Sequence, residues 1–142
     1  MTCSKLKLYS RLQHAAHVLK KTADRELISA AGLSTAQAAV LALVNTQKKI
    51  SQRDVAGELG FNESAVTAMV ARMIKLDFIS RLPNENDKRA KLLSLTTDGE
   101  AALKRAAVPF SAINARLDEA LGKDDIETLA RSLDQISDTF GD

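Results

Sequence analysis

The sequence has no tryptophan, and aromatic residues make up only 4% of its 142 positions. Its hydrophobic fraction of 45% is still enough for a core, so small and branched aliphatic residues must supply most of the packing. Alanine and leucine are strong helix formers, and a chain of this length is typically one domain. The composition therefore favours a single domain that is mainly α-helical.

Cysteine occurs once, at Cys3, which excludes an intramolecular disulfide and is typical of a reducing compartment. The N-terminus has no apolar segment of the signal-peptide type. Residues 27–47 carry no formal charge, but polar residues interrupt them, and a membrane span needs about 20 mostly apolar residues. We therefore expect a cytoplasmic protein without a membrane partner, and we interpret this stretch as a helix end, a turn and a second, buried helix.

Motifs of catalysis are also missing. We find no nucleophile motif, glycine-rich phosphate loop or pair of carboxylates that stands apart from helix capping. His14 and His17 are three residues apart, but no Cys, Asp or Glu lies near them to complete a metal site. We expect neither an enzyme nor a metal, and we interpret both histidines as solvated or interface residues.

The formal net charge of +2 is unevenly distributed. Residues 48–91 carry nine Lys and Arg against six Asp and Glu, whereas residues 121–142 carry two against six. A basic middle and an acidic end suggest that the middle meets a polyanion.

Apolar residues at steps of three and four predict a long helix over about residues 5–30. Gly32 is placed to end this helix, and Ser34 or Thr35 to cap a second one. Two shorter helices are expected next, the first beginning at Ser51 and the second at Asn62. Because a tight, glycine-containing turn joins them, they form a helix-turn-helix pattern.

The hydrophobic period then changes. Residues 78–83 and 90–95 are short β-type runs separated by a polar stretch, which predicts a hairpin with a charged tip. A helix to about residue 121 should follow from Thr96 or Thr97, and Thr97 with Glu100 has the spacing of a capping box. The last helix carries an apolar seam suited to docking on another helix, at Ile126, Leu129, Leu133, Ile136 and Phe140.

This order of elements resembles a winged helix-turn-helix domain, and three motifs resemble the MarR (multiple antibiotic resistance regulator) family more narrowly. They are L-S-T-A-Q at 33–37, S-Q-R-D-V-A-G-E-L-G-F-N-E-S-A-V-T at 51–67, and D-K-R-A-K-L-L-S-L-T-T-D-G at 87–99. The third is similar to the wing signature of that family, in which Asp-x-Arg-Ala precedes a strand and Leu-Thr-x-x-Gly. The resemblance covers roughly residues 30–105.

The resemblance implies a mainly α fold with a small β-hairpin wing (α+β) in a single domain over residues 1–142. Residues 33–96 would form the DNA-binding lobe, and residues 1–30 and 97–142 the dimerisation helices. It further implies a homodimeric transcription regulator, a repressor bound to a pseudo-palindromic site in double-stranded DNA. No cofactor is implied, but a small aromatic or phenolic effector would release the protein from DNA.

In a helix-turn-helix protein the second helix enters the major groove with its N-terminal residues at base edges. Ser64 and Thr67 are candidate hydrogen-bond donors there, and Arg72, one turn later, a phosphate contact. Gln52 and Arg53 begin the preceding helix, where an N-terminus meets a phosphate. The residues of this helix expected to face the DNA are Glu63, Ser64, Ala65, Thr67 and Ala68, and the capping residue Asn62 is also a candidate DNA contact.

By resemblance, the wing places Arg89 in the neighbouring minor groove, whose negative potential attracts arginine. Asp87 would hold the Arg89 guanidinium, and Lys88 and Lys91 would neutralise flanking phosphates.

Two positions depart from the pattern of the family. Ala68 stands where arginine is frequent, and Glu63 adds an acid nearby, so we expect thin base readout and more reliance on the wing and phosphates. Asp77 stands where glycine is usual, although aspartate tolerates a left-handed backbone.

Two alternatives remain open. One is a winged-helix module that has lost sequence-specific DNA binding and acts through protein contacts. The other is an oxidant-sensing regulator that uses Cys3, whose thiol lies near Lys5 and Lys7 but close to a terminus.

Overall fold

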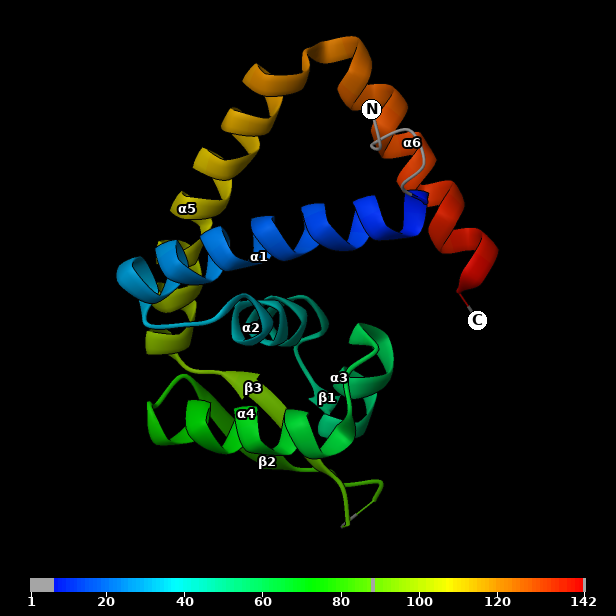
Figure 1. Ribbon diagram of the computed structural model, residues 1–142. Coiled ribbons are helices and arrows are strands. Elements are labelled where there is room, and N and C mark those ends of the chain that lie inside the picture. Colours follow the sequence, from blue (N-terminus) through cyan, green and yellow to red (C-terminus); the bar gives the residue numbers. More distant parts are fainter. Residues whose placement is uncertain (1–6, 88, 142) are drawn as a thin grey trace.

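The computed structural model describes residues 7–87 and 89–141, so Cys3, Lys5 and Lys88 lie outside the described residues. Within those ranges a lower lobe holds the middle of the chain, and the long first, fifth and sixth helices frame the upper part (Figure 1). The elements are α1 (Leu8–Ala31), α2 (Thr35–Gln47), β1 (Ile50–Ser51), α3 (Gln52–Leu59), α4 (Glu63–Lys75), β2 (Ile79–Pro83), β3 (Lys91–Leu95), α5 (Thr97–Leu121) and α6 (Lys123–Phe140).

The predicted hairpin is present and belongs to a three-stranded antiparallel sheet of order β1-β3-β2. Its register pairs Ile79 with Leu95 and Pro83 with Lys91. The additional strand, β1, pairs Ile50 with Leu93 on the other edge of β3 and was not predicted. A strand of two residues has no alternation to detect, so only its pairing partner reveals it.

Local capping signals place most helix ends where the sequence predicts them. The Ser34 hydroxyl accepts a hydrogen bond from the backbone N–H of Gln37, whose side chain in turn accepts from the Ser34 N–H. Ser51 caps α3 in the same way by accepting from the Asp54 N–H. Gly32 adopts the left-handed conformation that ends α1, with φ of 70°. Asp77 has φ of 64°, so it does take the conformation usual for glycine.

Of the two caps predicted for α5, Thr96 or Thr97, the structure uses the first. Thr96 is the N-cap, because its hydroxyl accepts a hydrogen bond from the Gly99 N–H at 2.9 Å. The capping box expected between Thr97 and Glu100 is therefore wrong by one residue. Thr96 is held in place from outside the helix, since its backbone N–H donates to the Phe78 carbonyl oxygen at 3.1 Å.

A contact between helices fixes the junction of α1 and α2. The two carboxylate oxygens of Asp24 accept hydrogen bonds from the Thr35 backbone N–H and from Lys20 Nζ, each at 2.7 Å. Burial alone raises the pKa of Asp24, but these bonds outweigh it and lower the pKa to about 2. By length and composition no single helix of the described residues passes for a membrane span, although α1 and α2, bent by 66° where they meet, pass as a pair.

The hydrophobic core lies in the lower lobe and leaves α6 uncovered. Fully buried side chains come from the end of α1, from α2, α3 and α4, and from the sheet, among them Leu27, Leu41, Val55, Met73 and Leu93. In contrast, α6 has no buried residue in the described chain, and Leu129 and Leu133 are each 43% exposed. Within the described ranges the apolar seam predicted for this helix is therefore mostly exposed, with only Ile126 and Ile136 half-buried.

Candidate nucleic-acid interface

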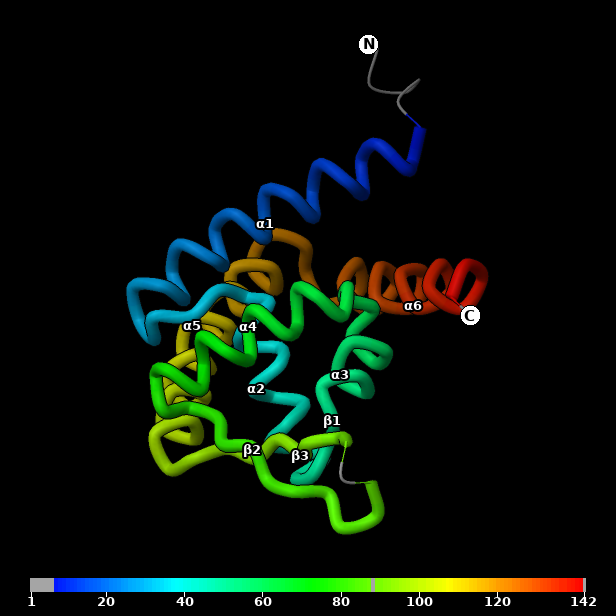
Figure 2. The backbone as a smooth tube through the Cα atoms, turned by 90° about the horizontal axis from the view of Figure 1, so that it is seen from below, coloured from blue at the N-terminus to red at the C-terminus, as the bar shows by residue number. Residues whose placement is uncertain are grey.

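Helix α4 buries one face and exposes the other. Asn62 caps it by accepting a hydrogen bond from the Ser64 N–H, and Val66, Val70 and Met73 are buried in the core. Viewed from below, α4 lies beside the wing strand β2 on the near face of the lobe (Figure 2). The opposite face of α4 consists of the exposed residues Glu63, Ser64, Ala65, Thr67, Ala68, Ala71 and Arg72.

The hydroxyl groups of this exposed face are already engaged as donors. Ser64 Oγ donates to Asn62 Oδ1 at 2.7 Å, and Thr67 Oγ1 donates to the Glu63 carbonyl oxygen at 2.9 Å. A hydroxyl has one proton and two lone pairs, so both groups face solvent as acceptors. This differs from the prediction that Ser64 and Thr67 donate to bases or phosphates, because the first turn of α4 uses both protons.

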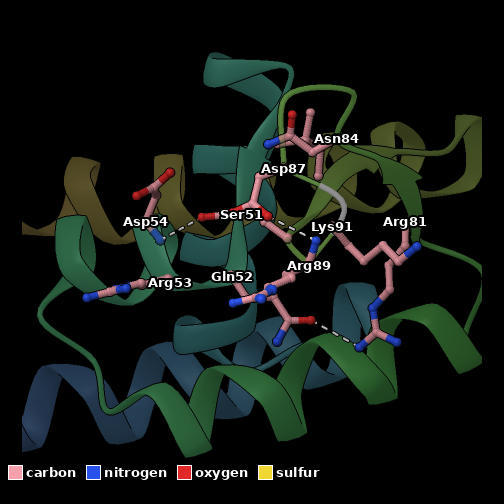
Figure 3. A pocket seen from close by; sticks show the side chains of 11 residues that line it. Ser51, Gln52, Arg53, Asp54, Arg81, Asn84, Asp87, Arg89 and Lys91 are labelled. Atoms are coloured by element: carbon pink, nitrogen blue, oxygen red, sulfur yellow. Dashed lines mark hydrogen bonds between the residues drawn. The ribbon is translucent and has the colours of Figure 1, made fainter.

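A basic groove of about 630 Å³ lies between the start of α3 and the wing (Figure 3). Four cationic side chains and two carboxylates line it, which gives the groove a net charge of +2. All six are exposed, so their charges are available to a large anion. They are Arg53, Asp54, Arg81, Asp87, Arg89 and Lys91.

The wing tip is organised by Asp87 through the backbone. Its carboxylate Oδ1 accepts a hydrogen bond from the Arg89 backbone N–H at 3.0 Å, and its carbonyl oxygen accepts from the Ala90 N–H at 3.2 Å (Figure 3). Among the residues that the structure describes, no ion pair joins the Asp87 carboxylate to the Arg89 guanidinium. In the structure without DNA, Asp87 thus shapes the turn that carries Arg89 instead of pairing with its guanidinium, and a contact between the two side chains on DNA stays a prediction.

Arg81 is a further residue of this surface, and sequence reasoning missed it. It donates from Nη2 to Gln52 Oε1 at 3.0 Å, and Gln52 Nε2 donates to Thr67 Oγ1 at 3.2 Å. Arg81 follows the buried Ile79 by two residues and so lies on the same face of the sheet, which favours an inward position. At Arg81, however, this face of the sheet lies beside the start of α3 and no longer against the core, so the charged side chain stays exposed.

The predicted site residues thus fall into two connected groups. Gln52, Arg53, Asp87, Arg89 and Lys91 line the groove, while the others described lie on the exposed face of α4. The hydrogen bond between Gln52 and Thr67 joins the two groups. Among the described residues, no three His, Cys, Asp or Glu side chains are grouped as metal ligands.

The comparisons with known proteins agree with this geometry. The sequence profile of the MarR family matches residues 33–91, which include α2, α3, α4, β2 and the wing loop as far as the first residue of β3. The transcriptional activatory protein BadR of Rhodopseudomonas palustris is 30% identical over 130 residues, which are 89% of this chain and 73% of BadR. The chain belongs to the MarR family.

Two other similarities extend over nearly the whole chain. The multiple antibiotic resistance protein MarR of Escherichia coli is 28% identical over 127 residues, 89% of this chain and 88% of that protein. The transcriptional repressor CouR, in a structure with a 23-mer DNA duplex, aligns with a TM-score of 0.88 and 27% identity over 96% of this chain and 95% of CouR. MarR-family proteins are transcription regulators rather than enzymes and use no cofactor. The winged helix-turn-helix fold inferred from the motifs is confirmed.

Proposed function

We propose that this MarR-family regulator is a homodimeric repressor that reads a pseudo-palindromic DNA site from both grooves. The recognition helix α4 lies in the major groove, and the wing reaches the adjacent minor groove. The observation that carries this proposal is the hydrogen-bonded series Arg81, Gln52 and Thr67, which places the wing, the start of α3 and the exposed face of α4 on one surface. CouR, which has a similar fold, is a repressor whose structure contains a DNA duplex.

The groove residues suit the phosphate backbone and the minor groove. Arg53 and Lys91 are exposed cations beside the N-terminus of α3, where Gln52 adds a polar side chain, and an anion is favoured at such a position. Arg89 is exposed at the wing tip and suits a narrow minor groove. The remaining proposed contacts are Asn62, Ser64, Ala65, Thr67, Ala68 and Arg72 on α4 or its cap, and Asp87 and Lys88 at the wing.

The uncovered helices support the proposed dimer. The proposed division gives residues 33–96 to the DNA-binding lobe and residues 1–30 and 97–142 to dimerisation. It is supported by α6, whose apolar seam lies exposed, with Phe140 82% accessible. Two lobes in such a dimer would present their α4 helices about 34 Å apart, one turn of DNA.

A small aromatic or phenolic effector would control the spacing of the lobes, so that effector and DNA compete for different states of the dimer. A groove of about 460 Å³ between α2 and α5 suits such a molecule, since alanines line much of it and Phe110 offers a ring. The sign of regulation is proposed as repression, although BadR is named an activator. Binding to genomic DNA would place the protein in the cytoplasm.

The test of this function begins with selection of duplexes from a random library by the wild-type protein. The affinity of the selected duplex should fall steeply as salt rises, because cations displace counterions from phosphates. Replacing Arg89 with alanine should weaken binding roughly tenfold, the scale of one lost minor-groove arginine. If no sequence is enriched, the protein acts through protein contacts. If the affinity changes neither with salt nor in Arg89→Ala, the wing mechanism is wrong.

A further inference from the structure

The hydrogen bonds between the wing and α4 run in one direction. Arg81 is always charged and has only donors, so it can pair only with the oxygen of the Gln52 amide, which lies 3.0 Å away. The Gln52 NH₂ group is then turned toward Thr67, where it donates to Oγ1 at 3.2 Å. A flipped Gln52 amide would set NH₂ against the guanidinium, with donors facing donors. Arg81 therefore fixes the orientation of Gln52 (Figure 3).

The same series fixes the Thr67 hydroxyl. Because Thr67 Oγ1 receives an N–H from Gln52, its own proton points elsewhere, and it donates to the Glu63 carbonyl oxygen at 2.9 Å. One of the two lone pairs of Oγ1 is used by Gln52, and the described part of the chain gives the other no partner. Thr67 is exposed on α4 and thus offers the major groove an acceptor instead of a donor.

We infer that Arg81 is a positioning residue for base readout: through Gln52 it holds Thr67 as an acceptor that selects adenine or cytosine. This inference rests on the proposed DNA-binding function. Only adenine N6 and cytosine N4 present donors in the major groove, whereas guanine and thymine present acceptors at the corresponding positions. Without Arg81, the Gln52 amide turns freely and stops donating to Thr67 Oγ1. The Thr67 hydroxyl is then no longer confined to the rotation that donates to the Glu63 carbonyl oxygen and can donate to a base, so that guanine and thymine are also accepted.

Arg53 provides a matched control. It lines the same groove, is exposed and carries the same charge, but it takes no part in the bonds that join Arg81, Gln52 and Thr67. Arg81→Gln and Arg53→Gln therefore remove the same charge from the groove, and only the first releases Gln52. Gln52→Leu is a second test variant, since it breaks the series without changing the charge.

The experiment uses the full chain and the duplex selected by the wild-type protein. The position read by Thr67 is the one whose base preference disappears in Thr67→Val, and affinities are then measured for all four base pairs there. The wild type should prefer adenine or cytosine by roughly five- to tenfold, the scale of one hydrogen bond. Arg81→Gln and Gln52→Leu should reduce this preference to about twofold or less, whereas Arg53→Gln should weaken all four duplexes alike and keep the preference.

Several results would overturn the inference. Uniform weakening by Arg81→Gln, as for Arg53→Gln, would make Arg81 a simple phosphate contact, and an unchanged preference in Gln52→Leu would exclude the bridge. A wild-type preference for guanine or thymine would exclude the acceptor role of Thr67. The same conclusion would follow if Thr67→Val kept the base preference of the wild type at every position. In each of these cases the wild type still enriches a sequence; failure to enrich any sequence instead refutes the proposed function, and this inference with it.

Discussion

Asp24 of α1 caps the first residue of another helix, since its carboxylate accepts a hydrogen bond from the Thr35 N–H at 2.7 Å. An unsatisfied N–H at the start of a helix is normally bonded by the residue just before it. Here Ser34 takes the Gln37 N–H, and Asp24, eleven positions away in sequence, takes that of Thr35. This bond ties the long helix α1 to the lobe that carries the recognition helix.

We expect this contact to make stability depend on pH. The pKa of Asp24 in the folded chain is about 2, below its ordinary value of 3.8, so folding favours the ionised form. Its contribution is complete well above the ordinary value and is lost as the pH falls through the folded one. Asp24→Asn should lower the free energy of unfolding at neutral pH by about 1–2 kcal/mol and by much less at pH ~2.

Urea unfolding at a fixed protein concentration measures this effect, because the stability of the proposed dimer would depend on protein concentration. Glu85→Gln, which removes an exposed carboxylate from the wing, serves as the control and should leave stability nearly unchanged. Equal losses for Asp24→Asn at neutral and acidic pH would show that the ionised carboxylate is not what stabilises the junction.

Gly99 lies in the first turn of α5 with no room for a side chain. A Cβ atom at this position would lie 2.1 Å from the Phe78 carbonyl oxygen, a backbone atom that also accepts a hydrogen bond from the Thr96 N–H. Gly99→Ala should therefore destabilise the protein by about 1–3 kcal/mol, as overpacking typically does. The measurement is the midpoint and slope of chemical unfolding.

Gly57 gives the opposite expectation and controls for the change from glycine to alanine. It lies within α3, and a Cβ atom there would meet nothing within 4 Å. Gly57→Ala should stabilise the protein by roughly 0.5–1 kcal/mol through helix propensity. If both variants change stability in the same direction, close packing at Gly99 is not the reason for glycine there.

Sequence reasoning succeeded where a residue has a local physical reason for its position. Ser51 and Asn62 cap helices because their side chains reach backbone N–H groups two or three residues later, and Gly60 ends α3 because it adopts a positive φ. Such signals lie within a few residues, so they can be recognised without knowing the fold. They located both helices of the helix-turn-helix.

The failures involve contacts between distant parts of the chain. Strand β1 is two residues long and exists because β3 lies beside it. The bond from Arg81 to Gln52 spans 29 positions, and no local pattern distinguishes Arg81 from an ordinary strand residue. Thr96 and Thr97 are equally good caps by type, and Phe78, in the turn between α4 and β2, selects Thr96 by accepting a hydrogen bond from its backbone N–H. These three features therefore depend on contacts between residues distant in sequence, which local sequence signals do not reveal.

The exposed seam of α6 predicts that this helix is required for the proposed dimer. Leu133→Glu places a charge on the seam and should convert the dimer to a monomer, since burying an unpaired charge is costly. Loss of the second lobe should weaken binding to a two-half-site duplex on the order of a hundredfold. Sedimentation equilibrium measures the mass, and fluorescence anisotropy measures the affinity.

Gln135→Glu adds the same charge to α6 at an exposed position outside the seam, and it should remain a dimer. A dimeric Leu133→Glu protein would place the subunit interface elsewhere, for instance on the exposed first half of α1. Monomers in both variants would mean that charge on α6, regardless of face, prevents association.

Asp87 allows the shape of the wing to be separated from its charge. Its carboxylate Oδ1 accepts from the Arg89 N–H, yet it also places a negative charge in a groove proposed for DNA. Asp87→Asn retains an acceptor oxygen and removes the charge, so it should bind the selected duplex as tightly as the wild type or several-fold more tightly. Asp87→Ala loses the acceptor as well and should bind roughly three- to tenfold more weakly, because the turn that carries Arg89 loosens.

Anisotropy titrations at two salt concentrations distinguish the two roles. If Asp87 only repels phosphates, both variants bind more tightly, and the gain is larger at low salt because screening is weaker. If the carboxylate charge itself holds the Arg89 guanidinium in the DNA complex, Asp87→Asn weakens binding as much as Asp87→Ala does. Only the turn-shaping role predicts weaker binding for Asp87→Ala without weaker binding for Asp87→Asn, and that difference is the expected result because the free wing already uses Asp87 Oδ1 to bind the Arg89 backbone.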